Sequence, residues 1–343
     1  MTHKSLIFSP MITRLLLGIA LAAQAPVQGQ GPPPKLTAFL RQRVGLDSAQ
    51  LAAIERGETV VKELKTSNGR DVALFGIAVV DMSRQAFVAR AANFSSSLSA
   101  PTRRFGIFHD PAAAADVAAA TMPADDLDEM QKCRPGDCKI KMPAADMQRL
   151  QSEVDWSSPN AQAQVSAYLR QRLVEYAGDY RARGDSALVV YDDKGAVHAS
   201  DAFGALLAQS PYIYEEVSSL GQYLAGYPRA SLDGAREVLY WKQDSLPGMR
   251  PLLSVDHLVL YTPPETPGAT LIADKQLYAS HYFEAAFYIT AVVERSGGSA
   301  YLVVLRRYRF DKLNAFVVRG KVVGKMRDQL RSELDRQKEI AKP

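Results

Sequence analysis

The last third of the chain constrains the fold most, because the spacing of its apolar residues changes there from helical to alternating. Alternation of apolar and polar side chains is typical of a β-strand whose two faces differ. The alternating segments, separated by proline- or glycine-rich turns, are residues 237–243, 252–261, 270–294 and 300–310. The third segment is several times longer than an ordinary strand of about five or six residues, so we predict that it bends or breaks near residues 279–284.

A long helix is predicted to follow these strands, over residues 316–340. Its apolar residues recur at every fourth position and form one stripe, made of Val318, Val322, Met326, Leu330 and Leu334. Such a stripe needs an apolar surface to cover, and the preceding sheet is the nearest one. The pattern therefore predicts the α+β class, with a curved antiparallel sheet packed on a long C-terminal helix.

Residues 36–100 are predicted to add N-terminal helices, a hairpin and a further helix to the same sheet. The two strands of the hairpin, 58–64 and 72–80, are rich in residues that favour strands. Between them, Asn68 and Gly69 form a pair that is typical of a hairpin turn. We therefore expect this segment to join the C-terminal strands in one domain.

The middle of the chain, residues 101–235, has helical spacing instead. The candidate helices there are residues 111–121, 144–154, 159–183, 201–209 and 212–226. We predict a large helical insertion into one composite domain, which is formed by residues 36–100 and 236–343.

The chain begins with the layout of a secretory signal peptide. Lys4 and Arg14 give it a positive start, and the apolar run over residues 15–23 is far shorter than the roughly 20 residues that a membrane-spanning helix needs. We expect residues 1–25 to be a signal peptide and residues 26–35 a proline-rich linker, so the mature protein would be periplasmic or secreted. A retained N-terminal membrane anchor is the alternative.

Cys133 and Cys138 are the only two cysteines of the chain, and Pro135 and Gly136 between them form a turn that brings them together. In an oxidising compartment, two such cysteines usually pair. Zinc is the rival interpretation, but two thiolates need two further ligands and no histidine lies nearby in the sequence. A redox role is less favoured, because the reactive pattern is Cys-x-x-Cys. We predict a disulfide that holds a local hairpin.

Composition and motifs exclude several functional classes. The chain has 41 Lys and Arg against 37 Asp and Glu, a balance that does not indicate a nucleic-acid partner. The basic stretch 306–325 fits contact with an anionic membrane surface, although solvated charges are the simpler interpretation. GxSxG, HExxH and GxGxxG motifs are absent from the sequence, and it has five histidines. We therefore expect neither a metal site nor a cofactor.

Ionisable residues within the predicted strands are the remaining candidates for a site. On the alternation of residues 270–294, one face carries Lys275 and His281 among apolar side chains that include Leu277, Phe283 and Phe287. The strand before it places His257 on a face with two valines. If both faces point inward, Lys275, His257 and His281 meet in one interior space, where a charge is costly unless it is paired or hydrated. The alternative is a bulge that changes the register, sends Lys275 to solvent and leaves the histidines hydrogen-bonded in the core.

The order of these elements resembles the START-like helix-grip fold. The matching segments are residues 57–98, with the opening Gly57-Glu58-Thr59-Val60-Val61, and residues 237–340. The resemblance implies a curved sheet that wraps a C-terminal helix around an apolar cavity for lipids, sterols or polyketides. The long helical stretch 101–234 departs from that family.

The leading hypothesis is an exported protein that binds an apolar ligand, a lipid, in a cavity between the sheet and the C-terminal helix. Lys275, His281, His257, Leu277, Phe283 and Phe287 are the candidate ligand-binding residues. One alternative is a hydrolase or cyclase that uses His281 with Glu284 or Lys275. The other is an envelope protein without a ligand, which acts through a partner surface on its helical insertion.

Overall fold

The computed structural model describes residues 31–98, 103–244, 250–313 and 316–342. The predicted signal peptide and the first part of the predicted linker lie outside these residues. Among the residues that are described, no helix has the length and apolar character to cross a membrane.

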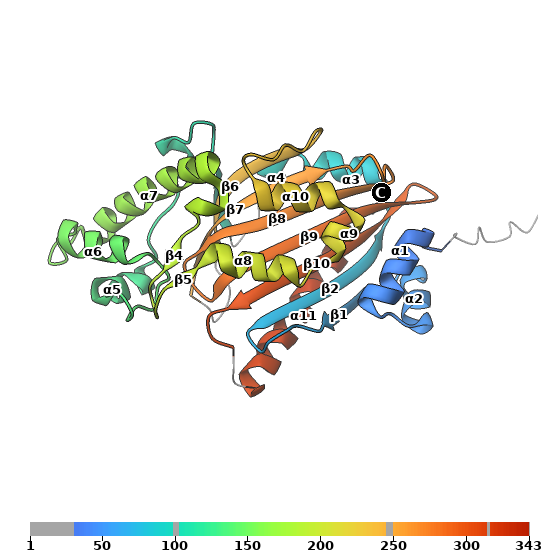
Figure 1. The fold of residues 1–343 in the computed structure, drawn as a ribbon, viewed down its shortest axis with the longest axis horizontal. Helices are drawn as coiled ribbons and strands as arrows, with labels where there is room; N and C mark the ends of the chain where they lie inside the picture. The colour runs from blue at the N-terminus through green and yellow to red at the C-terminus, as the bar shows by residue number, and fades with distance from the viewer. Residues whose placement is uncertain (1–30, 99–102, 245–249, 314–315, 343) are drawn as a thin grey trace, which may run out of the picture.

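An antiparallel sheet of eight strands forms the centre of the molecule, in the order β1-β2-β10-β9-β8-β7-β6-β3 (Figure 1). The strands are β1 (Val60–Leu64), β2 (Asp71–Val80), β3 (Arg103–Ile107), β6 (Arg236–Asp244), β7 (Leu252–Tyr261), β8 (Ala269–Ala279), β9 (Phe283–Arg295) and β10 (Ser299–Phe310). A separate two-stranded sheet joins β4 (Val190–Tyr191) to β5 (Val197–His198). The α+β class and the antiparallel sheet with a long C-terminal helix are confirmed. The edge strand β3 was not predicted, since it lies inside the segment that was expected to be helical.

The long alternating run breaks between Ala279 and Phe283, as predicted. Tyr282 there has a φ of 66°, which is unusual for a residue other than glycine. A second irregularity shifts the pairing of β9 with β10 between Arg309 and Phe310. Because the second irregularity leaves Glu284 as an extra residue in β9, Phe283 and Phe287 lie on opposite faces of the sheet.

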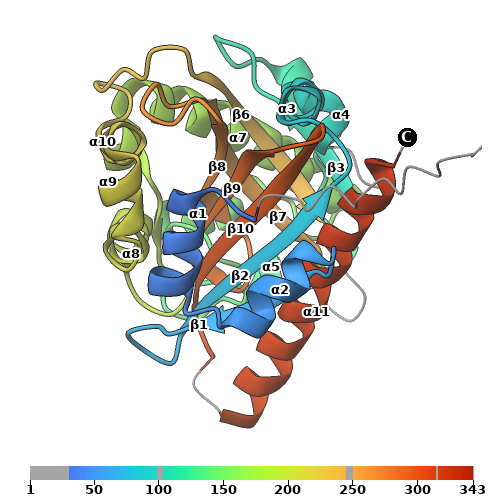
Figure 2. The same cartoon turned by 90° about the vertical axis from the view of Figure 1, so that its right-hand side faces the viewer.

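The C-terminal helix α11 (Phe316–Ile340) packs on β1 and β2 at one end of the sheet. Leu330 and Leu334 are buried there, and a Cβ atom at Gly76 would lie only 2.7 Å from Leu334 Cδ1. Gly76 thus lets the helix approach the strand closely. The predicted stripe is wrong at its first residue, because Val318 is 52% exposed where α11 extends past the sheet (Figures 1 and 2).

Helices cover both faces of the sheet, as Figure 2 shows. The face of α11 also carries α3 (Arg84–Ala91) and α4 (Phe94–Leu98). The opposite face packs against α1 (Pro34–Phe39), the π-helix η1 (Leu40–Val44), α2 (Ser48–Glu55), α8 (Ala199–Ala208), α9 (Tyr212–Glu216) and α10 (Ser218–Gly226). The predicted helix 212–226 is therefore two helices, which are separated at Val217.

The remaining helices of the insertion gather near the edge of the sheet that ends in β6 and β3 (Figure 1). They are α5 (Ala124–Lys132), α6 (Ala144–Glu153), α7 (Ala161–Arg183) and the 3-10 helices η2 (Ala114–Val117) and η3 (Gly184–Ala187). The alanine-rich segment 111–121 forms only the short η2. Cys133 and Cys138 form a disulfide with an S–S distance of 1.91 Å, as predicted.

Candidate functional site

An apolar pocket, called the α1–α9 pocket here, has a volume of about 470 Å³. Small-molecule sites in proteins typically measure about 300–1,000 Å³. The pocket lies between the sheet and the helices α1, α9 and α10, on the face opposite to α11. On the sheet side its lining is Leu271, Ile289, Ala291, Val293, Val303 and Leu305, and on the helix side Leu36, Phe39, Tyr212, Ile213, Val217 and Leu220.

The alternation of three strands creates the apolar floor of this pocket. Leu271 of β8 and Val303 of β10 both pair with Ala291 of β9, and Ile289 lies two residues before Ala291. All of these side chains therefore point to the same face of the sheet. Above them, the rings of Phe39 and Tyr212 meet edge to face at 5.7 Å and join α1 to α9.

The pocket has an exposed end and a buried end. Lys35, Glu216 and Glu294 line it where they are exposed to solvent, whereas Ile213 and Leu305 are buried. The exposed charges mark the mouth, and the buried lining residues away from it include Ile213, Leu220 and Leu305. The interior is therefore apolar, with charges confined to the mouth.

Arg307 lies just beyond the buried end, two residues after Leu305 and on the same face of β10. Its side chain is 6% exposed. Its Nε donates a hydrogen bond to the Tyr212 hydroxyl at 3.3 Å, and its guanidinium carbon is 5.9 Å from the centre of the Tyr212 ring. A buried cation thus lies behind an aromatic residue that lines the pocket.

A smaller cavity of about 80 Å³ lies among α5, α6, α7 and the end of β8. Its lining includes Met122, Met130, Met142 and Tyr168, whose hydroxyl donates to Asp146 at 2.6 Å. Arg172 pairs with the same carboxylate at 2.9 Å. The volume of this smaller cavity is well below the range of about 300–1,000 Å³ for small-molecule sites, so the α1–α9 pocket is the better candidate.

The predicted residues Lys275 and His257 are direct neighbours in the pairing of β7 with β8. Lys275 is fully buried, its Nζ donates to Asp185, and it lies 4.1 Å from the centre of the Phe203 ring. Burial lowers the pKa of Lys275, although Asp185 opposes that shift. Lys275 lies on the face opposite to α11, so the C-terminal helix does not cover it.

His257 forms a hydrogen-bonded group with residues of the same region. Its Nε2 lies 3.1 Å from Glu237 and its Nδ1 lies 3.1 Å from the Tyr180 hydroxyl. Burial lowers the pKa of His257, and the hydrogen bond to Glu237 opposes that shift. The ring of Tyr227 lies 4.7 Å from the His257 ring. Each ring nitrogen has a partner, as expected of a histidine in a packed core.

His281 does not join Lys275 and His257. It follows β8, and its Nε2 lies 3.0 Å from Asp126 of α5, while its Nδ1 lies 3.2 Å from the carbonyl of Lys139. Glu284 pairs instead with Arg70 at 2.7 Å, and burial raises the pKa of Glu284. The three groups of the predicted enzyme alternative thus contact three different partners, His281 with Asp126, Glu284 with Arg70 and Lys275 with Asp185.

The predicted apolar residues are also divided among three regions. Phe287 packs edge to face against Phe203 at 5.7 Å, beside the α1–α9 pocket. Leu277 packs with Trp241 and the insertion helices. Phe283 packs on Phe310 on the face of α11.

Sequence reasoning missed a group of buried polar residues on the α11 face, called the β6–β8 polar cluster here. It consists of the buried residues Tyr240, Lys242, Asp256 and Gln276 and of Asp274, which is half-buried. Lys242 Nζ lies 3.3 Å from Asp256, and the Tyr240 hydroxyl donates to Asp274 at 2.7 Å. Strand 252–261 is apolar at both parities, a signal that both faces are buried and hence that Asp256 is too.

Burial governs the protonation of this cluster. It raises the pKa of Asp256 to about 7, with Lys242 opposing the shift and Asp274 adding to it. One oxygen each of Asp256, Asp274 and Gln276 is buried without a hydrogen-bond partner. Buried oxygens of this kind are commonly satisfied by ordered water.

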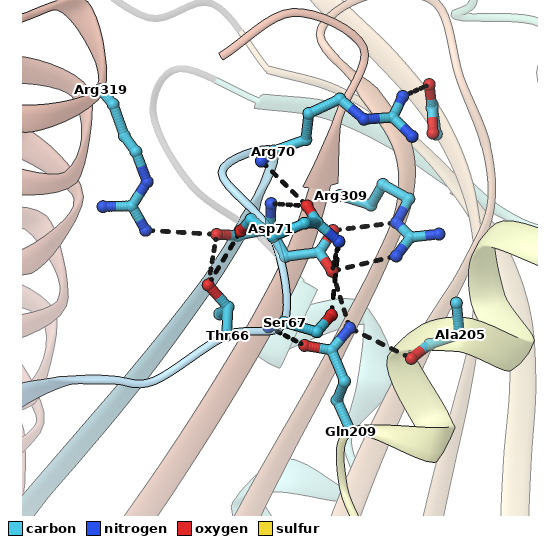
Figure 3. Close-up of polar contacts among 10 residues, drawn as sticks. Thr66, Ser67, Arg70, Asp71, Ala205, Gln209, Arg309 and Arg319 are labelled. Atoms are coloured by element: carbon cyan, nitrogen blue, oxygen red, sulfur yellow. Dashed lines mark hydrogen bonds and ion pairs between the residues drawn. The ribbon is translucent and has the colours of Figure 1, made fainter. Parts of the chain in front are cut away.

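A second polar network surrounds Asp71 at the start of β2 (Figure 3). Its carboxylate accepts from Arg309 at 2.9 and 3.0 Å and from Gln209 at 2.7 Å, and Asn68 of the hairpin also donates to it at 2.8 Å. Although burial alone would raise the pKa of Asp71, these donors lower it. The carboxylate is fully partnered and holds the hairpin to β10 and α8, so its role is structural.

Comparisons with known proteins identify no family for this chain. No protein-family model matches it, and no curated protein matches it. A solved structure that does match is that of norcoclaurine synthase from Thalictrum flavum, at 11% identity and a TM-score of 0.20, covering 37% of this chain and 79% of that chain. A TM-score this low carries no argument about fold or function. Membership of the START-like superfamily therefore stays a prediction.

Among the described residues, no group of three or more His, Cys, Asp or Glu side chains is arranged to hold a metal ion. The α1–α9 pocket remains as the site with a clear binding chemistry.

Proposed function

We propose that this chain is an exported protein that binds an apolar ligand, a lipid, in the α1–α9 pocket. The observation that carries the proposal is the pocket itself, with a volume of about 470 Å³ and a lining that is aliphatic and aromatic except at its mouth. Each square ångström of apolar surface removed from water contributes roughly 25 cal/mol, so a hydrocarbon chain is the ligand that such a lining favours. The location differs from the sequence-based hypothesis, which placed the cavity beside α11.

Export is the second part of the proposal. The disulfide between Cys133 and Cys138 fits an oxidising compartment, and the first 25 residues have the pattern of a signal peptide. Contact of residues 306–325 with an anionic membrane stays a separate prediction.

Titration with N-phenyl-1-naphthylamine, an apolar fluorescent probe, tests the pocket. Ala291 lines it and is only partly buried, so Ala291→Trp fills the space with little disturbance of the strand. The matched control is Ala119→Trp, at an exposed position of the insertion. We expect the probe to bind the unmodified protein and the control alike, and Ala291→Trp to weaken binding by about tenfold or more, equivalent to about 1.4 kcal/mol.

Two results would overturn the proposal. One is an unmodified protein that does not bind the probe, and the other is an Ala291→Trp variant that binds it as the control does. Native mass spectrometry of the mature chain gives an independent measurement, because a lipid that co-purifies should be lost from the Ala291→Trp variant.

A further inference from the structure

Arg307 differs from the other buried cations in having no anionic partner. Lys141, Lys242 and Lys275 are buried to a similar extent, and each lies within 4.0 Å of a carboxylate, that of Asp193, Asp256 or Asp185. Arg307 is 6% exposed, yet no Asp or Glu side chain of the described residues lies within 4.0 Å of its guanidinium. Its hydrogen bond goes to the Tyr212 hydroxyl.

Although Arg309 and Asp71 form an ion pair at the next position along the same face, the neighbours of Arg307 across the strands are apolar. Its neighbours in register are Phe287 of β9 and Ala73 of β2, and both are buried. A buried charge without a counterion is costly, and a guanidinium cannot relieve that cost by losing its proton. The site therefore favours an anion supplied by something other than these side chains.

The α1–α9 pocket leads toward this cation. Val303 and Leu305 line the pocket, and Arg307 is the next residue of β10 on that face, about 6.6 Å further along the strand. Tyr212 connects the two, since its ring lines the pocket and its hydroxyl contacts Arg307. An apolar chain in the pocket would thus have its inner end beside a guanidinium and a phenol.

We propose that the ligand of the α1–α9 pocket is a long-chain carboxylate, bound with its head inward against Arg307 and Tyr212. This inference rests on the proposed apolar pocket and adds the chemical class of the ligand. The planar guanidinium and the hydroxyl together offer donors to the two oxygens of a carboxylate, and charge-assisted hydrogen bonds of this type are the strong ones. The hydrocarbon tail then lies along Leu305 and Val303 toward the mouth.

The experiment compares dodecanoate, dodecan-1-ol and dodecyl phosphate by isothermal titration at neutral pH. The unmodified protein should bind dodecanoate about tenfold or more tightly than the alcohol, because only the acid supplies an anion to Arg307. Arg307→Met should abolish that preference while the alcohol still binds. Arg307→Lys keeps the charge but not the planar donor pair, so it should retain part of the preference.

Two further variants test which end of the α1–α9 pocket holds the carboxylate head of the ligand. Lys35→Met removes the cation at the mouth, and Arg327→Met removes an exposed arginine from α11 on the other side of the sheet. Neither should change the ratio of the two dissociation constants. If Lys35→Met removes the preference and Arg307→Met does not, the head lies at the mouth and the inference is wrong.

Stability separates a binding role from a structural one. Removing a buried charge without a carboxylate partner should leave the thermal midpoint of Arg307→Met unchanged or higher. A lower midpoint together with an unchanged preference for dodecanoate would overturn the inference. If this variant does not fold, the comparison of acid with alcohol in the unmodified protein and in Arg307→Lys decides.

The outcomes also distinguish this inference from the proposed function. Equal affinity for dodecanoate and dodecan-1-ol would reject the carboxylate site and leave the apolar pocket intact. Tighter binding of dodecyl phosphate than of dodecanoate would reject the carboxylate class. Failure of all three to bind would reject both proposals.

Discussion

Truncation of Leu330 to alanine tests the packing of α11 on the sheet. The Leu330 side chain is fully buried, and its Cγ and Cδ2 atoms would lie 3.2 Å from a Cβ atom at Gly76. Leu330→Ala removes three carbon atoms, each worth about 0.8 kcal/mol of transfer free energy, and leaves a cavity, so the expected loss is about 2–5 kcal/mol. Val318→Ala is the control from the same stripe, and because Val318 is 52% exposed, its effect should stay within about 0.5 kcal/mol.

The assay is urea unfolding followed by circular dichroism, with a common m-value for the three proteins. A Leu330→Ala variant within about 0.5 kcal/mol of the unmodified protein would refute the packing of α11 on β2. Equal losses for Leu330→Ala and Val318→Ala would refute the assignment of the buried part of the stripe.

The close approach at Gly76 extends this prediction to a double-mutant cycle. A Cβ atom there would lie 2.7 Å from Leu334 Cδ1, so Gly76→Ala should cost about 1–3 kcal/mol through overpacking. Leu334→Ala removes the atom that clashes, and the double variant should therefore lose less than the sum of the single losses. Strictly additive losses would show that Leu334 does not contact Gly76.

Three further predictions concern the polar groups and the disulfide. Burial raises the pKa of Asp256 to about 7 in the folded state, above about 3.9 in the unfolded state, so the folded state binds more protons between these pH values. The free energy of unfolding should therefore fall by up to about 4 kcal/mol as pH rises from about 4 to 7. Asp256→Asn should flatten this pH profile, and parallel profiles for the two proteins would contradict the prediction. His281→Gln should lower the free energy of unfolding by about 1–3 kcal/mol, because Asp126 loses a buried partner, and should leave the binding of N-phenyl-1-naphthylamine unchanged. Weaker binding of the probe at unchanged stability would instead place His281 in the site. Thiol labelling of the denatured protein without reductant should find Cys133 and Cys138 unreactive, and two reactive thiols would reject the disulfide.

Regular elements were predictable from the sequence where a single periodicity runs through them. The strand 252–261 and the helix 316–340 have the predicted boundaries, because each spacing continues without interruption to a turn. The strand β3 was missed because its sequence, Arg-Arg-Phe-Gly-Ile, has no clear alternation and it becomes a strand only by pairing with β6, far away in the chain. Residues 212–226 were predicted as a single helix, not as α9 and α10, because their apolar spacing continues across Val217.

The candidate site was less predictable, since it depends on which helix covers which face of the sheet. Alternation correctly grouped Lys275 with Phe287 on one face, but nothing in the spacing says whether α11 or α8 covers that face. The α1–α9 pocket also needs Phe39 and Tyr212, two residues far apart in the sequence whose rings meet only in the folded chain.

The chemistry of the buried groups separates Arg307 from the β6–β8 polar cluster as a place for a ligand. Asp256 can reduce the cost of its burial by taking up a proton, and the raised pKa of about 7 shows that burial favours that neutral form. The oxygens of the cluster that lack a hydrogen-bond partner are acceptors, and ordered water molecules can donate to them. Arg307 cannot become neutral in this way, because the charge of a guanidinium is permanent. An anion beside Arg307 would supply the charge-assisted hydrogen bonds that the neutral Tyr212 hydroxyl does not, so Arg307 is the buried cation whose environment most favours an anionic ligand.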